Sequence, residues 1–214
     1  MSRPAIKLYN FPRSGHAHRA ELMLSLLQLP TELIFVDLAK GAHKTPEFLA
    51  LNPFGQVPAI DDSGTIISDS NAILVYLAEK SGELLPQDPA ARYQCLQWLM
   101  FQMGGIGPMF GQLGFFHKFA GKDYEDKRPR DRYVAESARL LGVLDKHLEG
   151  RTWIMGEQYS IADIATFPWV RNLIGFYEAG ELVQFERFTN VRRVLEAFLQ
   201  RPAVTAGLNI PARD

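Results

Sequence analysis

The sequence predicts an N-terminal α/β domain followed by a C-terminal helical bundle domain. Over the first 80 residues, segments with strand-like and helix-like apolar patterns alternate. After residue 89, apolar residues recur only at helical spacing. The stretch SGELLPQDP between the two regions contains a glycine and two prolines, which end helices and are typical of linkers. We therefore expect one domain at residues 1–81, a linker at 82–88 and an all-helical domain at 89–214.

The first elements of the α/β domain follow from local patterns. A strand, a helix and a second strand are expected at residues 6–9, 17–28 and 32–36. Thr45 followed by Pro46 is typical of a helix start, because the threonine caps the helix and proline fits its first position. A short helix is therefore expected at residues 48–51.

Residues 55–73, GQVPAIDDSGTIISDSNAI, combine a hairpin with a helix start. Two short apolar runs flank the turn DDSG, which predicts a β-hairpin, and Asp69 and Ser70 then open an apolar-periodic helix. Pro58 lacks a backbone N–H donor, so we expect it at the start or the edge of a strand. The N–H and C=O groups of the preceding Val57 would then be free to bind an extended peptide. The N–H groups of the helix start favour an anion. Together these features suit a small anionic peptide.

Four helical segments are expected in the second domain. The first begins near residue 90 and is interrupted by a cluster of helix-weakening residues: Gly104, Gly105, Gly107 and Pro108. The second covers about 130–147, and the last covers roughly 191–200. Between them, a helix opens at Ser160, where Ser-x-x-Asp with Asp163 is a variant of the capping box.

Composition excludes several classes of protein. The chain carries 23 lysines and arginines against 24 aspartates and glutamates, so its charge gives no reason to expect nucleic acid or a membrane surface as partner. No apolar run approaches the ~20 residues of a membrane span, and the N-terminus lacks the apolar centre of a signal peptide. With a single cysteine as well, we expect a cytoplasmic protein. The five histidines show no metal spacing and there is no glycine-rich phosphate loop, so neither a metal nor a cofactor is expected.

The hairpin and helix of 55–73 resemble the glutathione site of glutathione transferases. The opening KLYNFPRSGHAHRAELMLSLLQLP resembles the first strand, active-site turn and first helix of that family, and SIADIATFPWV resembles the core helix of its C-terminal domain. The run QWLMFQMGGIGPMFGQ is similar to the bacterial nu class. The resemblance covers nearly the whole chain and implies a thioredoxin-like glutathione-binding domain followed by a helical domain that holds the acceptor site.

Ser14 is the candidate catalytic residue. It lies in a Pro-x-Ser-Gly turn before the first helix and matches the serine of serine-type bacterial glutathione transferases. Lowering a thiol pKa from 8.5 to about 6.5 takes roughly 2.7 kcal/mol of thiolate stabilisation. A hydroxyl hydrogen bond to a charged sulfur supplies about 1.5–3 kcal/mol, and a helix N-terminus up to ~2 kcal/mol more. The alternative is that Ser14 only caps the helix.

Tyr9 and Asn10 are the rivals for the group that assists the thiolate. Some classes of the family use a tyrosine at the end of the first strand, and Asn10 stands at that place here. Tyr9 should point to the opposite sheet face, because side chains alternate along a strand. The nu class often relies on a threonine and an asparagine in this turn. Arg13 could add positive potential near the thiolate, and the favoured alternative is that it is simply an exposed arginine.

The resemblance also assigns the remaining contacts of glutathione. Ser70 is expected to bind the γ-glutamyl carboxylate and Asp69 the neighbouring ammonium group, although both residues also suit a simple helix cap. Val57, held by a cis Pro58, is expected to bond the cysteinyl backbone. Three residues are candidates for the glycyl carboxylate: Lys44, Gln56 and, less favoured, His43.

The resemblance further implies an acceptor site lined by the turn near Phe11 and by the long helix of the second domain. Phe11, Met103 and Phe110 are its candidate residues, and core packing is the alternative for the aromatic residues of that helix. Cys95 lies among apolar residues of a helix, where an inert buried thiol is expected rather than a nucleophile.

We therefore predict a glutathione-dependent detoxification enzyme, a glutathione transferase. It is expected to transfer the thiolate to a small hydrophobic electrophile or to use it to reduce disulfides or peroxides. Disulfide reduction needs a second thiol that the chain does not offer at the site, so a second glutathione is expected to supply it. The alternative is a non-catalytic glutathione-binding or regulatory protein with the same fold. The family resemblance also implies a homodimer.

Overall fold

The structure is a computed structural model that describes residues 4–12 and 14–207. The chain divides into two compact units: the first contains the described residues up to Glu83 together with those from Gln200 on, and the second is Leu84–Leu199. The first unit has a sheet with helices and the second has helices without a named strand, so the predicted fold class is confirmed. The exact domain limits stay a prediction, and the grouping of residues from Gln200 on with the first unit differs from the expected range 89–214.

A four-stranded mixed sheet forms the centre of the first unit, with the order β2-β1-β3-β4. Its strands are β1 (Ile6–Asn10), β2 (Thr31–Phe35), β3 (Ala59–Asp62) and β4 (Thr65–Ser68). β1 pairs parallel with β2 and antiparallel with β3, and β3 pairs antiparallel with β4. The predicted hairpin is therefore present, next to the first strand.

The hairpin turn is shorter than the four residues predicted from the sequence. Pairing continues to Asp62 opposite Thr65, which leaves only Ser63 and Gly64 in the loop. Both have positive φ, 55° and 95°, as a two-residue hairpin loop of type I′ requires. Asp61 belongs to the strand, and its Oδ1 accepts a hydrogen bond from the Gly64 N–H at 2.8 Å, so its side chain still supports the turn.

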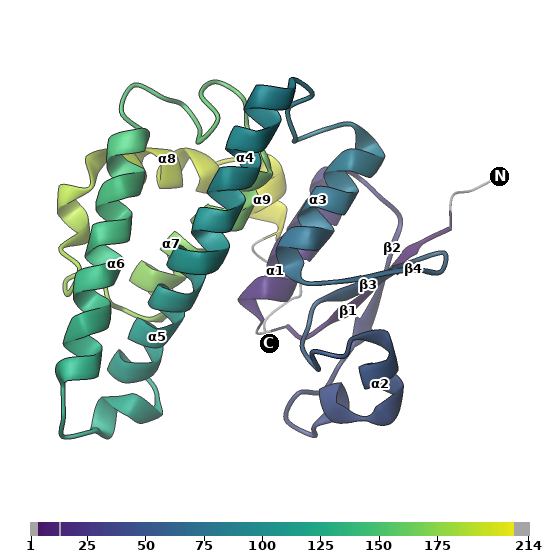
Figure 1. Cartoon of the computed structure of the whole chain (residues 1–214), viewed down its shortest axis with the longest axis horizontal. Coiled ribbons are helices and arrows are strands. Elements are labelled where there is room, and N and C mark those ends of the chain that lie inside the picture. Colours follow the sequence, from purple (N-terminus) through teal and green to yellow (C-terminus); the bar gives the residue numbers. More distant parts are fainter. Residues whose placement is uncertain (1–3, 13, 208–214) are drawn as a thin grey trace. The chain divides into compact units, whose positions relative to one another are not determined.

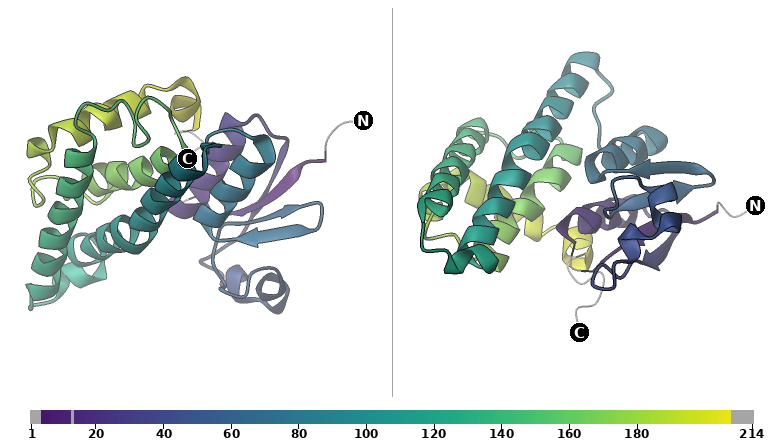
Figure 2. Two further views of the ribbon diagram at one scale, coloured as in Figure 1. Left: turned by 45° about the horizontal axis from the view of Figure 1, so that its top comes forward. Right: turned by 60° about the horizontal axis from the view of Figure 1, so that its bottom comes forward.

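Helices cover both faces of this sheet (Figures 1 and 2). Helices α1 (Gly15–Leu26) and α3 (Ser70–Ser81) pack against each other, and α9 (Pro202–Gly207) packs against α1. Helix α2 (Pro46–Leu51) covers the other face, where the rings of Phe48 and Tyr9 meet edge to face at 6.2 Å. Thr45 caps α2 as predicted, since its side chain accepts from the Phe48 N–H.

The second unit is a bundle of helices around one buried helix. Its helices are α4 (Pro89–Phe101), α5 (Gly107–His117), α6 (Arg128–His147), α7 (Ile161–Arg171) and α8 (Thr189–Leu199). Helix α7 is buried from Ile161 through Val170 and packs against α4, α5 and α8. The predicted capping box is present at its start, where Ser160 and Asp163 bond each other's backbone groups.

The glycine cluster after α4 changes the helix type instead of ending the helix. Residues Gln102–Ile106 form a π-helical turn between α4 and α5, as a local widening of the helix. A second π-helical turn, Asn172–Phe176, follows α7 and was not predicted. Short 3₁₀ turns at Ala42–Lys44, Ala120–Asp123 and Phe185–Arg187 complete the described elements.

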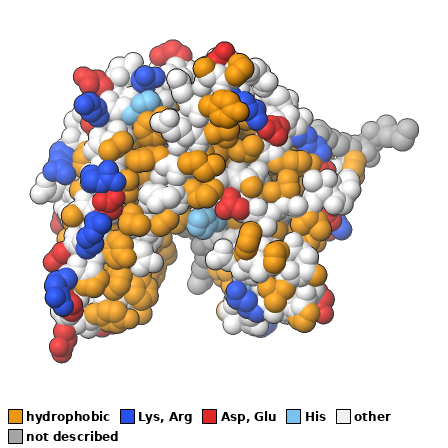
Figure 3. Space-filling view, in the orientation of Figure 1, with side chains coloured by type: hydrophobic (Ala, Val, Ile, Leu, Met, Phe, Trp, Pro, Cys, Tyr) orange, Lys and Arg blue, Asp and Glu red, His pale blue; other side chains and the backbone are white. Residues whose placement is uncertain are grey.

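Surface charge is mixed in sign along α6. Figure 3 shows basic and acidic side chains interspersed along the edge that this helix forms. Glu136 accepts from Arg139 at 2.7 Å and lies 3.6 Å from Arg132, so part of this charge is neutralised locally. No helix within residues 4–12 and 14–207 is long and apolar enough to cross a membrane. The same residues contain no group of three or more His, Cys, Asp or Glu side chains arranged to hold a metal ion.

Candidate active site

A cavity of about 480 Å³ lies in the first unit, where the turn after β1, the loop after α2 and the start of α3 converge. It contains every residue predicted to contact glutathione: Ser14, Lys44, Gln56, Val57, Pro58, Asp69 and Ser70. His43, the less favoured candidate for the glycyl carboxylate, lines it as well. The remaining lining residues were not among those predictions: His16, Leu38, Asn52, Phe54 and Gly55. The sequence therefore located the cavity, and the roles of its residues stay predictions.

Ser14 is the N-cap of α1. Its Oγ accepts a hydrogen bond from the Ala17 N–H at 3.2 Å, and its side chain is half-buried at the cavity wall. A hydroxyl that accepts with a lone pair keeps its own hydrogen for donation. The capping role and the donation of a hydrogen bond to a thiolate are therefore compatible in the same side chain. Arg13 lies outside the described residues.

Neither rival of Ser14 lines the cavity. Asn10 is 5% exposed, and its Nδ2 donates to Glu21 Oε2 on α1 at 3.0 Å. Burial raises the pKa of Glu21, although the hydrogen bond from Asn10 opposes the shift. Tyr9 points to the opposite face, toward Phe48, as strand alternation predicted.

The Val57–Pro58 peptide bond is cis, as the resemblance implied. The Val57 side chain packs into an apolar cluster with Ala17, Val36 and Phe48. Strand pairing begins only at Ala59, so the backbone groups of Val57 take no part in the sheet. Val57 therefore lines the cavity with its side chain anchored in the core and its backbone groups outside the strand pairing.

The start of α3 forms one end of the cavity. Asp69 has a φ of 76°, and its Oδ1 accepts from the N–H groups of Asn71 and Ala72 at 2.8 and 3.0 Å. The cap that the sequence suggested is therefore present. Within the described residues no hydrogen bond is found for the Ser70 N–H, which remains at the positive end of the helix.

A buried arginine connects α1 to this helix start. Arg19 is 1% exposed, and it donates to Ser70 Oγ at 2.6 Å and to Asn71 Oδ1 at 2.9 Å. Its Nη2 also lies 2.7 Å from Nδ1 of His16, whose ring borders the cavity. Desolvation of the ring, and then the charge of Arg19, lower the pKa of His16 to about 4. Sequence analysis missed both residues, although their i, i+3 spacing places them on one face of a helix.

The loop between α2 and β3 is held by Asn52, which sequence analysis also missed. This side chain is 1% exposed, donates to the Gln56 carbonyl at 2.6 Å and accepts from the Phe54 N–H at 3.0 Å. Lys44 Nζ donates to the Gly55 carbonyl at 3.0 Å, which places its ammonium group at the same rim of the cavity. Asn52 thus fixes the backbone next to the two residues proposed for the glycyl carboxylate.

The predicted acceptor residues differ in exposure. Phe110 has no exposed surface, so the core-packing alternative fits it better than a ligand-lining role. Met103 is 39% exposed on the π-helical turn, and Phe11 is half-buried in the first unit with its ring 6.1 Å from that of Phe35. The acceptor role of Phe11 and Met103 stays a prediction.

Cys95 is fully buried in α4, as expected of an inert thiol. Burial raises the pKa of its thiol, and a hydrogen bond with Ser160 only partly offsets this. A thiol that is both buried and protonated is a poor nucleophile.

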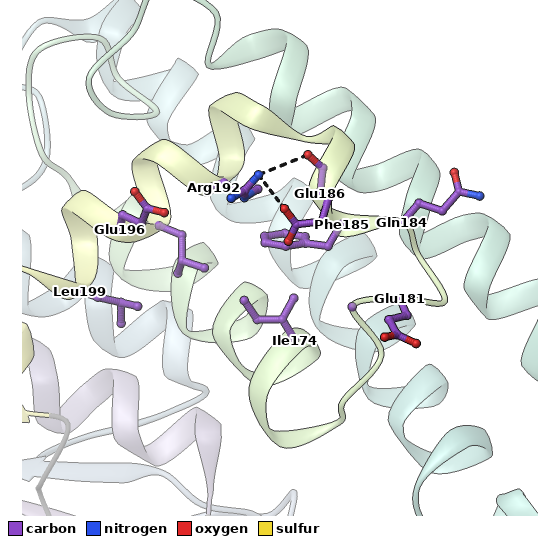
Figure 4. Close-up of a pocket in the computed structure, with 10 residues that line it drawn as sticks. Ile174, Glu181, Gln184, Phe185, Glu186, Arg192, Glu196 and Leu199 are labelled. Atoms are coloured by element: carbon purple, nitrogen blue, oxygen red, sulfur yellow. Dashed lines mark hydrogen bonds and ion pairs between the residues drawn. The ribbon is translucent and has the colours of Figure 1, made fainter.

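A second cavity, of about 680 Å³, lies in the second unit (Figure 4). Its apolar wall includes Ile174, Phe185 and Leu195. The Arg192 guanidinium lies 2.7 Å from the Glu186 carboxylate, so its one basic side chain is paired. It is larger than the cavity of the first unit, but it offers neither a hydroxyl nor a thiol for thiolate chemistry.

Comparisons with known proteins agree along most of the chain. The glutathione S-transferase N-terminal domain model matches residues 4–79, and the C-terminal domain model matches residues 107–202. The disulfide-bond oxidoreductase YfcG of Escherichia coli is 44% identical over 172 residues, which cover 77% of this chain and 79% of that protein. A glutathione transferase of Burkholderia graminis, solved with two glutathione molecules per subunit, is 60% identical to this chain, with a TM-score of 0.92. The match covers 98% of this chain and 90% of that protein's chain. One from Pseudomonas putida, solved with one glutathione disulfide per subunit, is 57% identical with a TM-score of 0.92, over 97% of this chain and 92% of its own.

Proposed function

This chain belongs to the glutathione S-transferase family, and from that premise we propose that it binds glutathione in the cavity of its first unit. The observation that carries the proposal is that this one cavity gathers Ser14, the cis Val57–Pro58 bond and the start of α3. Glutathione is a co-substrate here. The protein is a glutathione-dependent enzyme, because its relatives are transferases and disulfide-bond oxidoreductases. These relatives favour an enzyme over the non-catalytic binding protein.

Ser14 is proposed to stabilise the glutathione thiolate. Its hydrogen is available to the sulfur because Oγ already accepts from Ala17, and the N-terminus of α1 adds partial positive charge. A donor aimed at the charged sulfur is worth about 1.5–3 kcal/mol. That is enough to lower a thiol pKa by roughly 1–2 units.

The rest of the cavity is proposed to orient the peptide. Val57 supplies backbone groups for the cysteinyl residue, in the manner of an added strand. Ser70 and Asp69 receive the γ-glutamyl carboxylate and ammonium group at the start of α3. At the other end of the cavity, Lys44 and Gln56 receive the glycyl carboxylate.

Disulfide reduction is the proposed chemistry alongside conjugation to an electrophile and reduction of peroxides. A glutathione thiolate attacks one sulfur of a substrate disulfide, forms a mixed disulfide and releases a thiolate that takes up a proton. A second glutathione thiolate then attacks the mixed disulfide, which yields glutathione disulfide and the second thiol. The relatives solved with two glutathione molecules or with glutathione disulfide support this order of steps. We also propose a cytoplasmic homodimer, as the family resemblance implies.

The test compares turnover of 2-hydroxyethyl disulfide with conjugation of 1-chloro-2,4-dinitrobenzene in the wild type, Ser14→Ala and Ser14→Thr. We expect kcat/KM of Ser14→Ala to fall about 10- to 100-fold at neutral pH, since one hydrogen bond to a charged group is lost. Ser14→Thr keeps the hydroxyl and the cap, so it should retain most activity. Equal rates in the wild type and Ser14→Ala would remove Ser14 from the mechanism.

If the wild type binds glutathione but turns over neither substrate, the binding-protein alternative is correct. Faster disulfide turnover than conjugation supports the second-glutathione mechanism, whereas the reverse identifies a conventional transferase.

A further inference from the structure

The guanidinium of Arg19 lies inside the first unit, directly behind the proposed γ-glutamyl site. It is carried by α1, yet it reaches Ser70 and Asn71 in the first turn of α3, as well as His16 one turn back on α1. An arginine that is 1% exposed loses most of its hydration, so it must be compensated by hydrogen bonds and charge.

The direction of each hydrogen bond follows from the chemistry of the guanidinium. It carries five N–H donors and no acceptor, so Ser70 Oγ, Asn71 Oδ1 and His16 Nδ1 must all accept from it. The ring proton of neutral His16 must therefore sit on Nε2. The hydrogen of the Ser70 hydroxyl must point away from Arg19, either to His16 Nδ1 at 3.2 Å or into the cavity that Ser70 lines.

We propose that Arg19 is a positioning residue for the α-carboxylate of the γ-glutamyl group. It donates to the oxygen of the Ser70 hydroxyl, which leaves the hydroxyl hydrogen available to the ligand, and it places a full positive charge behind the partial charge of the α3 N-terminus. This inference rests on the proposed function, and it adds a residue of α1 to a site otherwise built from the α3 start.

Charge at this position supports the same role. Burial lowers the pKa of Arg19 to about 10, and the charge of Asp69 opposes the shift, so the side chain remains charged at neutral pH. Asp69 offsets part of this charge in the free protein. Arg19 and Asp69 together suit the two charged groups of a γ-glutamyl end. The carboxylate would lie toward Ser70 and Arg19, and the ammonium group would lie toward Asp69.

The test uses two ligands that differ in this carboxylate. S-methylglutathione has it, and S-methyl-(4-aminobutyryl)-cysteinylglycine lacks it, and neither has a reactive thiol. In titration calorimetry we expect Arg19→Gln to weaken S-methylglutathione about 10- to 100-fold, as loss of a charge-assisted contact does, and the decarboxylated ligand less than about twofold. Arg19→Lys keeps the charge without the planar fork, so its loss for S-methylglutathione should be intermediate.

Kinetics separate positioning from structural damage. With glutathione as the varied substrate, Arg19→Gln should raise KM far more than it lowers kcat. Arg128→Gln, which removes an arginine with a 90% exposed side chain, is the matched control and should leave both ligands' affinities unchanged. If Arg19→Gln fails to fold, the affinities of Arg19→Lys for the two ligands are compared instead. A larger loss for S-methylglutathione than for the decarboxylated ligand supports the inference.

Two results would overturn the inference: equal weakening of both ligands, or undiminished binding of S-methylglutathione by Arg19→Gln. Failure of the wild type to bind S-methylglutathione would instead overturn the proposed function together with the inference. The two failures are therefore distinguishable.

Discussion

A histidine that accepts a hydrogen bond from an arginine cannot be protonated at that nitrogen without losing the bond. Nδ1 of His16 lies 2.7 Å from Nη2 of Arg19, so the neutral ring is the form that fits. Its pKa in the folded protein, about 4, lies below the ordinary value of 6.5. Between pH 6.5 and 4, His16 is therefore protonated in the unfolded chain but stays neutral in the folded protein.

The sign of the resulting pH dependence is fixed by this difference. Because the unfolded state binds more protons between pH 6.5 and 4, His16 destabilises the fold as pH falls through that window. His16→Gln stays neutral, so we expect the stability difference between the wild type and this variant to move against the wild type on acidification from pH 7 to 4.5. Urea unfolding at both pH values measures it. Parallel pH profiles of the two proteins would show that His16 titrates normally.

At the scale of elements, local sequence signals located most helix starts. Thr45 and Pro46 begin α2, and the box of Ser160 and Asp163 begins α7, because these caps depend on neighbours within three residues. The role of Arg19 was not predicted, because its partner Asn71 is 52 residues away and no local pattern shows which side chains meet across two helices. The helix α9 was missed as well, since its packing partner is α1 at the other end of the chain.

The capping box of α7 predicts a large loss of stability when the Asp163 carboxylate is replaced by an amide. The Asp163 carboxylate has no exposed surface and accepts from the N–H groups of Ile154 and Ser160, both at 2.9 Å, and from Ser160 Oγ at 3.1 Å. Asp163→Asn replaces one acceptor oxygen with a donor, which leaves a buried N–H unsatisfied, so we expect a loss of about 2–3 kcal/mol in the free energy of unfolding.

Urea unfolding at pH 7 measures the loss. Asp131→Asn removes an exposed carboxylate from the first turn of α6 and should change stability by less than about 0.5 kcal/mol. A loss in Asp163→Asn no larger than in this control would mean that the box does not hold the helix start.

At the scale of the whole molecule, the count of thiols constrains the chemistry. The chain has one cysteine, and in α4 its side chain is completely buried. Reduction of a disulfide needs two thiols, of which the protein supplies none in a reactive form. Both must come from glutathione, so the proposed mechanism consumes two glutathione molecules in each turnover.

Cys95→Ala separates this mechanism from one that uses the protein's own thiol. Because the second thiol comes from glutathione, we expect disulfide turnover by Cys95→Ala to stay within about twofold of the wild type at 25 °C, despite the small cavity left in the core. Native wild-type protein should also fail to react with Ellman's reagent until it is unfolded, when one thiol per chain appears, because burial raises the pKa of Cys95. Loss of disulfide turnover with conjugation intact would instead identify Cys95 as the resolving thiol. Its exposure would then have to change during the reaction, and the native protein would react with the reagent.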